Sequence, residues 1–280
     1  MNHEVFAALG EALKHGEEVA LVTIVAANGS TPQRVGAKML VYADGRTVGT
    51  IGGGCYENEA LWKARESLQT RKAISVRYEL ADDFAEESGL ICGGQMEVFI
   101  EPIEASPAVY IFGAGHVGQF VGRVAHDAGF QVHVVDDREQ FANRERFPDA
   151  AAIVVADIPT WLSTTRLPAS AYAVIVTRGH RHDLDALRSL AAQNLRYLGL
   201  IGSRAKVKRL YDMVAEDGSI PLDRLETIHA PIGLDIGAVT PQEIAVSIVA
   251  ELIAVRRGKE QKVAAASLKW MPKLNVAARS

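Results

Sequence analysis

Hydrophobic and polar positions divide the chain into two parts that follow different periodicities. Over the first hundred residues, a helical pattern is followed by strand-like apolar runs, one more helix and further strands. Beyond residue 107, short apolar runs alternate with helical stretches, as in a parallel sheet covered by helices on both faces. We therefore expect an α/β protein, with an N-terminal mixed α+β domain followed by a doubly wound parallel-sheet domain.

The first part is predicted to contain two helices and five strands. Gly16 ends the first helix, whose single apolar face is formed by Val5, Phe6, Leu9 and Leu13. The second helix is expected over residues 57–69. The strands are expected over residues 19–26, 39–42, 47–51, 73–80 and 95–101, with a hairpin turn at Asp44-Gly45.

A segment with two prolines in seven residues, 101–107, separates the two parts. The domains are accordingly expected over residues 1–101 and 108–258, joined by a linker over 102–107. In the second domain, strands are expected over residues 109–112, 131–135, 151–155, 173–177 and 196–201, with a helix over 117–127. Its last long helix carries a capping box formed by Thr240, Pro241 and Glu243.

Composition restricts the class of protein. Hydrophobic residues make up 48% of the 280 residues and charged residues 23%, which is typical of a soluble globular protein. The net charge of −4 gives no reason to expect nucleic acid as a partner, and no segment reaches the ~18 consecutive apolar residues of a membrane span. Two cysteines favour a reducing, cytoplasmic location over a disulfide framework. The basic stretch 259–280 is expected to be a loosely ordered tail, or else a docking segment.

The second domain opens with a glycine-rich turn, Gly113-Ala114-Gly115-His116-Val117-Gly118. A GxGxxG pattern is weak evidence by itself, but this one follows an apolar strand and precedes an amphipathic helix. Gly113 permits a tight turn, Gly115 lets the backbone approach phosphates, and Gly118 lets helix and strand pack closely. The turn therefore predicts a Rossmann-like domain that binds a nucleotide.

Asp136 ends the next strand, 18 residues after Gly118, and could accept a hydrogen bond from a ribose hydroxyl. Asp137 disfavours a 2′-phosphate, although Arg138 leaves that choice open. His116 could touch a phosphate or could simply be exposed. The alternative is a doubly wound domain that has kept the turn and binds no ligand.

Cys55 follows three glycines, Gly52, Gly53 and Gly54, at the junction of a strand and a helix. Glycines leave room for a ligand, and a helix N-terminus stabilises negative charge, so this thiol is a candidate nucleophile or soft-metal ligand. Cys92 lies in a second glycine-rich turn. Both cysteines could instead be small buried residues, and no zinc site is expected because neither has a CxxC partner.

Three more polar segments follow strands. Ser30 and Arg34, in Gly29-Ser30-Thr31-Pro32-Gln33-Arg34, could hold an anionic group or form an ordinary surface turn. Gly202-Ser203-Arg204 follows a later strand and could hold a phosphate.

The segment 177–183 places His180 and His182 after a buried strand, at the edge where doubly wound sheets bind ligands. The alternative is an exposed helix start, with Asp183 near the positive end of the helix dipole. Two histidines alone supply too few ligands for a metal site.

Several segments, in order along nearly the whole chain, together resemble the XdhC/CoxI family. In the first half these are GSTPQRVGAKMLV, IGGGCYE and CGGQMEVFIEP; in the second they are VYIFGAGHVGQ, VVDDRE, VTRGHRHDLDALR, YLGLIGSRAKV and IHAPIGLDIGAVTPQEIAVSIVAELIAVRRG. The combination is far more specific than the GxGxxG pattern.

The resemblance implies a chaperone that binds the molybdenum cofactor (molybdopterin), shields it and supports its sulfuration by a cysteine desulfurase. It then delivers the cofactor to an apo molybdenum hydroxylase of the xanthine dehydrogenase type. The family's cofactor-associated cysteine matches Cys55, which could contact the molybdenum, and Cys92 matches the CGG signature. The resemblance also implies a homodimer.

Under this interpretation the ligand of the Rossmann-like domain could be NAD, another nucleotide or the phosphate-bearing end of the cofactor. Two other functions stay open at this stage. One is an NAD-dependent oxidoreductase acting on a small molecule between the two domains, with His180 or His182 as the only candidates for proton transfer. The other is a nucleotide-sensing scaffold for hydroxylase assembly.

Overall fold

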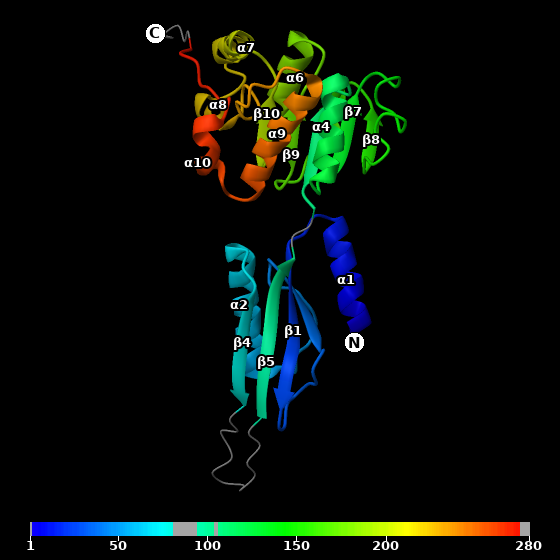
Figure 1. Ribbon diagram of the computed structural model, residues 1–280, viewed down its shortest axis with the longest axis vertical. Helices are drawn as coiled ribbons and strands as arrows, with labels where there is room; N and C mark the ends of the chain where they lie inside the picture. Colours follow the sequence, from blue (N-terminus) through cyan, green and yellow to red (C-terminus); the bar gives the residue numbers. More distant parts are fainter. Residues whose placement is uncertain (1, 81–93, 104–105, 275–280) are drawn as a thin grey trace. The chain divides into compact units, whose positions relative to one another are not determined.

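The computed structural model describes residues 2–80, 94–103 and 106–274, and the chain forms two compact units, Met1–Ser106 and Pro107–Ser280 (Figure 1). The first unit is a five-stranded antiparallel sheet with the strand order β3-β2-β1-β5-β4. Its strands are β1 (Val19–Asn28), β2 (Lys38–Tyr42), β3 (Thr47–Gly49), β4 (Ile74–Leu80) and β5 (Gly94–Ile103). The hairpin expected at Asp44-Gly45 is confirmed, since β2 pairs with β3 around it.

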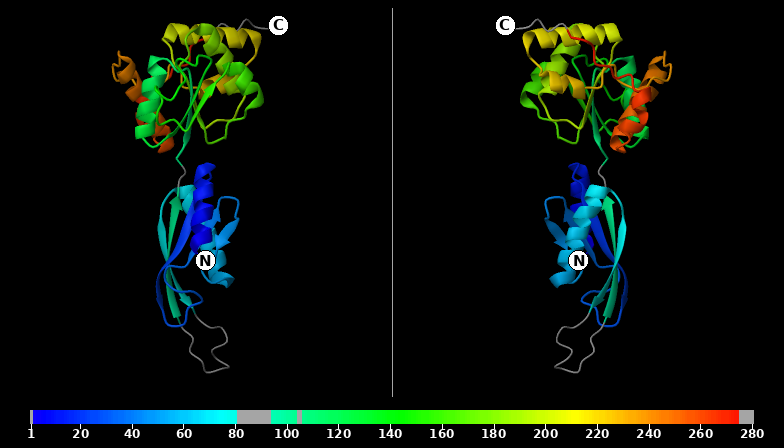
Figure 2. Two further views of the ribbon diagram at one scale, coloured as in Figure 1. Left: turned by 90° about the vertical axis from the view of Figure 1, so that its right-hand side faces the viewer. Right: turned by 90° about the vertical axis from the view of Figure 1, so that its left-hand side faces the viewer.

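One helix covers each face of this sheet (Figure 2). Side chains alternate between the faces of a strand, and the central strand β1 directs Ala20, Val22 and Ile24 toward α2 (Gly54–Thr70). Its other face, with Val19 and Leu21, packs on α1 (Asn2–Lys14). A strand that is buried on both faces has a continuous run of apolar residues, and this run is the pattern from which β1 was predicted.

The apolar face of α1 differs from the expected one, because Ala8 and Ala12 take part in it and Phe6 does not. Val5 and Ala12 are buried against the sheet, whereas the side chain of Phe6 is 51% exposed. Phe6 follows Val5 directly, and consecutive residues on a helix point about 100° apart, so both cannot face the core.

The last strand of the first unit extends into the segment that was expected to be a linker. Residues Pro102 and Ile103 continue β5 and pair with β1. The other neighbour, β4, begins at Ile74 opposite Ile100, so the part of β5 after Ile100 has a partner on one side only. A proline is tolerated there because it lacks only a donor that the missing neighbour would have used.

The second unit is a five-stranded parallel sheet with the strand order β10-β9-β6-β7-β8. Its strands are β6 (Ala108–Phe112), β7 (Gln131–Asp136), β8 (Ala152–Val155), β9 (Tyr172–Ile175) and β10 (Tyr197–Leu200). The order reverses direction at β6, and the crevice between β6 and β9 at their carboxyl ends is the place where such sheets bind ligands.

Helices cover both faces of this sheet (Figure 2). One face carries α4 (His116–Asp127) and α9 (Pro241–Arg256), and the other carries α5 (Ile158–Thr164), α6 (His180–Ala191), α7 (Arg204–Asp217) and α8 (Leu222–Thr227). The capping box at the start of α9 is confirmed: Thr240 and Glu243 each accept a hydrogen bond from the backbone N–H of the other.

The described part of the basic tail is packed rather than loose, so that expectation was wrong. It forms α10 (Glu260–Val263) and the 3₁₀ helix η1 (Ala264–Ala266), and Leu274 lies against the core. The backbone N–H groups of Leu268 and Trp270 donate to the carbonyls of Gly233 and Ala230. The composition of this stretch did not indicate the packing, because the exposed lysines give it a basic average although apolar residues stand between them.

None of the helices in the described ranges combines the length and apolar character that a bilayer crossing requires.

Candidate functional site

Cys55 lies in the first turn of α2, directly after three glycines with backbone angles that only glycine adopts easily. The φ angles of Gly52, Gly53 and Gly54 are 129°, 77° and 71°. This turn lets the chain leave β3 and begin α2 with the thiol of Cys55 exposed at its N-terminal end. The strand–turn–helix junction expected from the sequence is therefore present, and the helix begins three residues earlier than expected.

The carboxylate of Glu57 holds this turn together. One of its oxygens accepts hydrogen bonds from the hydroxyl of Thr50 at 2.5 Å and from the backbone N–H groups of Ile51 and Gly53 at 2.9 and 3.0 Å. Burial alone would raise the pKa of Glu57, but these hydrogen bonds outweigh it and the pKa is lowered. The N–H groups of the turn thus bind an internal carboxylate, and the thiol of Cys55 remains available to a ligand.

Three segments singled out in the sequence meet beside this turn. A side chain at Gly52 would lie 2.6 Å from the ring of Pro32, and one at Gly94 would overlap the carbonyl oxygen of Ser30. The loop 29–34 is therefore packed between the glycine turn that precedes Cys55 and the end of the CGG signature at Gly94. Cys92 itself lies outside the described residues.

The side chains of Ser30 and Arg34 are exposed on this loop. Within the described residues, the guanidinium of Arg34 forms no ion pair. The loop can thus present a cation and a hydroxyl next to the glycine turn, which is the chemistry expected for an anionic group.

In the second unit, the glycine-rich turn is closely packed at two of its glycines. A side chain at Gly113 would overlap the carbonyl of Val176 at the end of β9, and one at Gly118 would overlap the carbonyl of Gly113. Gly115 has open space instead, with nothing within 4 Å of an added Cβ atom. The roles expected for the three glycines fit this packing, and His116 is exposed as the first residue of α4.

Asp136 is used differently from a ribose-binding carboxylate. Its side chain is 4% exposed, and each of its oxygens accepts two hydrogen bonds. Oδ1 accepts from the backbone N–H of Arg138 at 3.0 Å and from its Nε at 2.8 Å; Oδ2 accepts from Nη2 of Arg138 at 2.8 Å and from the N–H of Ala114 at 2.7 Å. A carboxylate has about four acceptor positions, so a ribose hydroxyl would have to displace one of these donors.

The next residue, Asp137, pairs with Arg178 across the end of β6. Their side chains lie 2.7 Å apart, and both are more than 40% exposed. Asp137 follows β7 and Arg178 follows β9, the two strands that flank β6. Asp136 and Asp137, the acidic residues that the sequence suggested as contacts for a nucleotide, are therefore both engaged in ion pairs within the protein.

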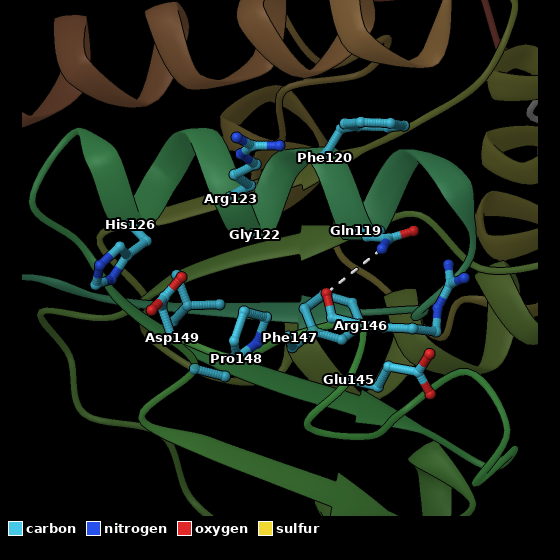
Figure 3. A pocket seen from close by; sticks show the side chains of 12 residues that line it. Gln119, Phe120, Gly122, Arg123, His126, Glu145, Arg146, Phe147, Pro148 and Asp149 are labelled. Atoms are coloured by element: carbon cyan, nitrogen blue, oxygen red, sulfur yellow. Dashed lines mark hydrogen bonds between the residues drawn. The ribbon is translucent and has the colours of Figure 1, made fainter.

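The loop between β7 and β8 packs against α4 (Figure 3). The amide of Gln119 donates to the carbonyl of Arg146 at 3.5 Å, and the guanidinium of Arg146 donates to the carbonyl of Ala114 at 3.4 Å. The ring of Phe147 packs on Gly122, where a side chain would lie 3.1 Å from it. A pocket of about 340 Å³ remains between α4 and this loop, with Arg123 and His126 on the helix side.

The segment 177–183 leads from β9 into α6, which begins at His180. An exposed helix start was one of its two interpretations, and it does not hold for Asp183, whose side chain is fully buried. Its carboxylate accepts a hydrogen bond from the hydroxyl of Thr177 at 2.7 Å and lies 2.5 Å from the ammonium of Lys206. A buried carboxylate needs such partners. Lys206 comes from α7, and its stem crosses Gly202, which has no side chain to obstruct it. His180 is the first residue of α6.

No cluster of three or more histidine, cysteine or carboxylate side chains is arranged to hold a metal within the described ranges. Two residues that organise the sites, Glu57 and Lys206, were not singled out in the sequence. A glutamate in the first turn after GGGC was a usable signal for Glu57, because acidic residues there can bind the free N–H groups. Lys206 had no such signal, since its partner Asp183 lies on another helix.

Residues 109–252 match the model of the XdhC Rossmann domain, and residues 12–79 match the model of the XdhC and CoxI family. A crystal structure described as a xanthine dehydrogenase from Bacillus halodurans matches with a TM-score of 0.51 and 24% identity. The match covers 91% of this chain and 96% of that one. The expected fold class, a mixed α+β domain followed by a Rossmann-like domain, is confirmed.

Relatives align over most of the chain. The Escherichia coli protein YqeB is 36% identical over 238 residues, which are 85% of this chain and 43% of YqeB, so the chain spans less than half of that relative. A probable xanthine dehydrogenase subunit of Bacillus subtilis is 27% identical over 88% of this chain and 95% of its own length. The molybdenum cofactor insertion chaperone PaoD of Escherichia coli is 24% identical over 90% of this chain and 87% of its own length.

Proposed function

The chain belongs to the XdhC and CoxI family, and on this basis we propose that it is a maturation factor for a molybdenum enzyme. In this role it binds the molybdenum cofactor as cargo and passes it to an apo molybdenum hydroxylase of the xanthine dehydrogenase type. The names of two relatives, a molybdenum cofactor insertion chaperone and a probable subunit of xanthine dehydrogenase, support the proposal.

The observation that carries the proposal is the exposed thiol of Cys55 at the start of α2. Molybdenum bound by dithiolene sulfur is a soft centre, and thiolate is a ligand that soft metals prefer. Glu57 fixes the turn without using the thiol, so the chain can hold Cys55 ready for cargo.

The surroundings of Cys55 fit the rest of such a cargo. The exposed guanidinium of Arg34 and the hydroxyl of Ser30 belong to the loop that packs on the same turn, and both can bind an anionic phosphate. Gly52, Gly53 and Gly54, the three residues before Cys55, add no side chains to its surroundings. Cys92, which precedes Gly94 by two residues, is proposed as a second contact.

Two finer steps belong to the same proposal. The protein shields the cofactor until transfer, and it holds the cofactor while a cysteine desulfurase supplies the terminal sulfur. In the Rossmann-like unit, the glycine-rich turn is proposed to bind a phosphate group of the cargo or of a nucleotide. The four donors already bound to Asp136 favour a ligand that needs no ribose contact at that carboxylate.

The test is cofactor content. The protein is produced in a host that makes the molybdenum cofactor, and the molybdenum and pterin bound per chain are measured for the wild type and for Cys55→Ser and Cys55→Ala. We expect bound cofactor in the wild type and retention weaker by about tenfold or more in both variants, since even indirect partners of a metal contribute about that much. Gln69→Ala, at the exposed far end of α2, is the matched control and should retain cofactor normally.

Transfer is tested by mixing the cofactor-loaded protein with an apo xanthine dehydrogenase and following the recovery of the enzyme's activity. A parallel sample in which the apoenzyme receives free cofactor gives the comparison. Equal cofactor retention in Cys55→Ala would remove Cys55 from the site. Absence of cofactor from the wild type, together with no gain in transfer over free cofactor, would overturn the maturation role.

A further inference from the structure

A pocket of about 590 Å³ lies at the far edge of the Rossmann sheet, away from the glycine-rich turn. The short segment around His229 extends the sheet here by a parallel bridge to Gly199 in β10. The other walls are formed by the last turn of α9, by α10, by the start of η1 and by the residues after η1. Figure 1 labels α9, α10 and β10 in this unit. The volume falls in the range of small-molecule sites, about 300–1,000 Å³. Nothing in the proposed maturation role uses this pocket.

A buried carboxylate, Glu251, forms its floor. The side chain is 2% exposed, and its oxygens are surrounded by donors. Oε2 accepts from the hydroxyl of Tyr197 at 2.5 Å and from the N–H of Gly233 at 2.9 Å, while Oε1 accepts from the hydroxyl of Ser267 at 2.8 Å. Nδ1 of His229 lies 3.2 Å from the same Oε1. Three hydrogen bonds occupy acceptor positions of Glu251 and Nδ1 of His229 lies against the remaining one, so the charge of Glu251 acts through its neighbours.

This contact fixes the orientation of the His229 ring. Nδ1 is shielded from solvent beside Glu251, and the ring lies against that of Tyr197 with 4.4 Å between their centroids. Because the carboxylate can only accept, Nδ1 carries the proton, and Nε2 is the ring nitrogen left for the pocket that His229 lines. A carboxylate beside one ring nitrogen fixes the orientation of a histidine.

The remaining lining divides into charged and apolar parts. Lys269 supplies an ammonium that forms no ion pair within the described part of the chain, and Glu260 supplies one partly exposed carboxylate. The apolar walls are formed by small and branched side chains, namely Ala254, Val255, Val263 and Ala264. Glu260 and the buried charge of Glu251 repel an anion, and repel a dianion most, whereas Lys269 and a protonated His229 attract a single negative charge placed between them.

We propose that this pocket is a second ligand site of the protein, which takes a small carboxylic acid with an apolar body. In the complex His229 is an imidazolium, which donates from Nδ1 toward Glu251 and from Nε2 to the carboxylate of the ligand. The ammonium of Lys269 binds the same carboxylate, and the apolar body lies on the side chains of α9 and α10. Glu251 is a positioning residue in this site, because it orients His229 without touching the ligand.

The test uses benzoate as the probe and the uncharged benzamide as its matched control, with binding followed by calorimetry and by the NMR signals of the His229 ring in the full-length protein. We expect saturable binding of benzoate with a shift of the His229 signals, and binding of benzamide that is about tenfold weaker or undetectable, since a charge-assisted contact is lost. Inorganic phosphate should bind more weakly than benzoate.

Two variants separate ligand binding from folding. His229→Asn keeps a donor beside Glu251 and removes Nε2, and Lys269→Met keeps the aliphatic stem and removes the charge. Both should retain the thermal unfolding midpoint within a few degrees and bind benzoate about tenfold more weakly, whereas Lys262→Met on the exposed side of α10 should bind normally. Unchanged binding in His229→Asn, equal loss in Lys262→Met, or no saturable binding of benzoate to the wild type would each overturn the proposal.

Discussion

The carboxylate of Asp136 accepts a 2.7 Å hydrogen bond from the backbone N–H of Ala114, so the end of β7 is fastened to the glycine-rich turn after β6. The first unit uses the same device, because the carboxylate of Glu57 accepts from the N–H groups of Ile51 and Gly53 in the turn before α2. In both units an acidic side chain holds a glycine turn in place. Such preorganisation lowers the entropic cost of binding a ligand at the turn.

Asp136→Asn is expected to destabilise the second unit. The substitution leaves Arg138 without its carboxylate in a largely buried pair, and breaking such a pair costs about 3 kcal/mol. Hydrogen exchange of the β6 and β7 amides measures the loss. Asp137→Asn is the control, because its pair with Arg178 is exposed and contributes ~0–1 kcal/mol. Equal effects of the two variants would contradict the role given to Asp136.

Gly118→Ala and Gly115→Ala should have opposite consequences for the same turn. A methyl group at Gly118 overlaps the carbonyl of Gly113, so we expect a loss of about 3 kcal/mol or more in the free energy of unfolding. At Gly115 the methyl group meets open space, and the φ of −66° suits alanine, so stability should change by less than about 1 kcal/mol. Urea unfolding measures the stability of the two variants. If the turn binds phosphate, Gly115→Ala should stay stable and bind the phosphate-bearing ligand more weakly than the wild type does.

Glu57→Ala should loosen the turn before Cys55. The N–H groups of Ile51 and Gly53 lose their acceptor, at a cost of about 1–3 kcal/mol for buried donors left unpaired. The alkylation rate of Cys55 reports the change, with Glu59→Ala on an exposed position of α2 as control. A rate and stability identical to those of the control would show that Glu57 does not organise the site.

Stability should fall in acid, in part through Glu251. Burial raises the pKa of this carboxyl, but the hydrogen bonds from His229, Tyr197 and Gly233 outweigh burial and hold the pKa below its ordinary value of 4.5. A group whose pKa is lowered on folding stabilises the fold above its unfolded pKa, and this stabilisation is lost as the pH falls through the folded value. Unfolding free energies measured from about pH 6 to about pH 3 should therefore decrease, and less steeply in Glu251→Gln. The same slope in both proteins would contradict the lowered pKa.

Local patterns predicted most elements of the fold because each depends on neighbours in sequence. The capping box at Thr240 and Glu243, the hairpin at Asp44-Gly45 and the glycine-rich turn with its flanking strands are all confirmed. The packed tail was missed, since the hydrogen bonds from Leu268 to Gly233 and from Trp270 to Ala230 join residues 35 and 40 positions apart and leave no periodic signal.

The sequence by itself determined the two-part fold, the family, and the positions of Cys55 and of the glycine-rich turn. The tertiary structure decided what the polar side chains do. Asp136 had the spacing of a ribose acceptor and became the internal anchor of Ala114. Asp183, for which the sequence left an exposed helix start open, is buried beside Lys206. The reason is that spacing along the chain fixes local conformation, whereas the partner of a charged group depends on which distant segments the fold brings within hydrogen-bonding distance.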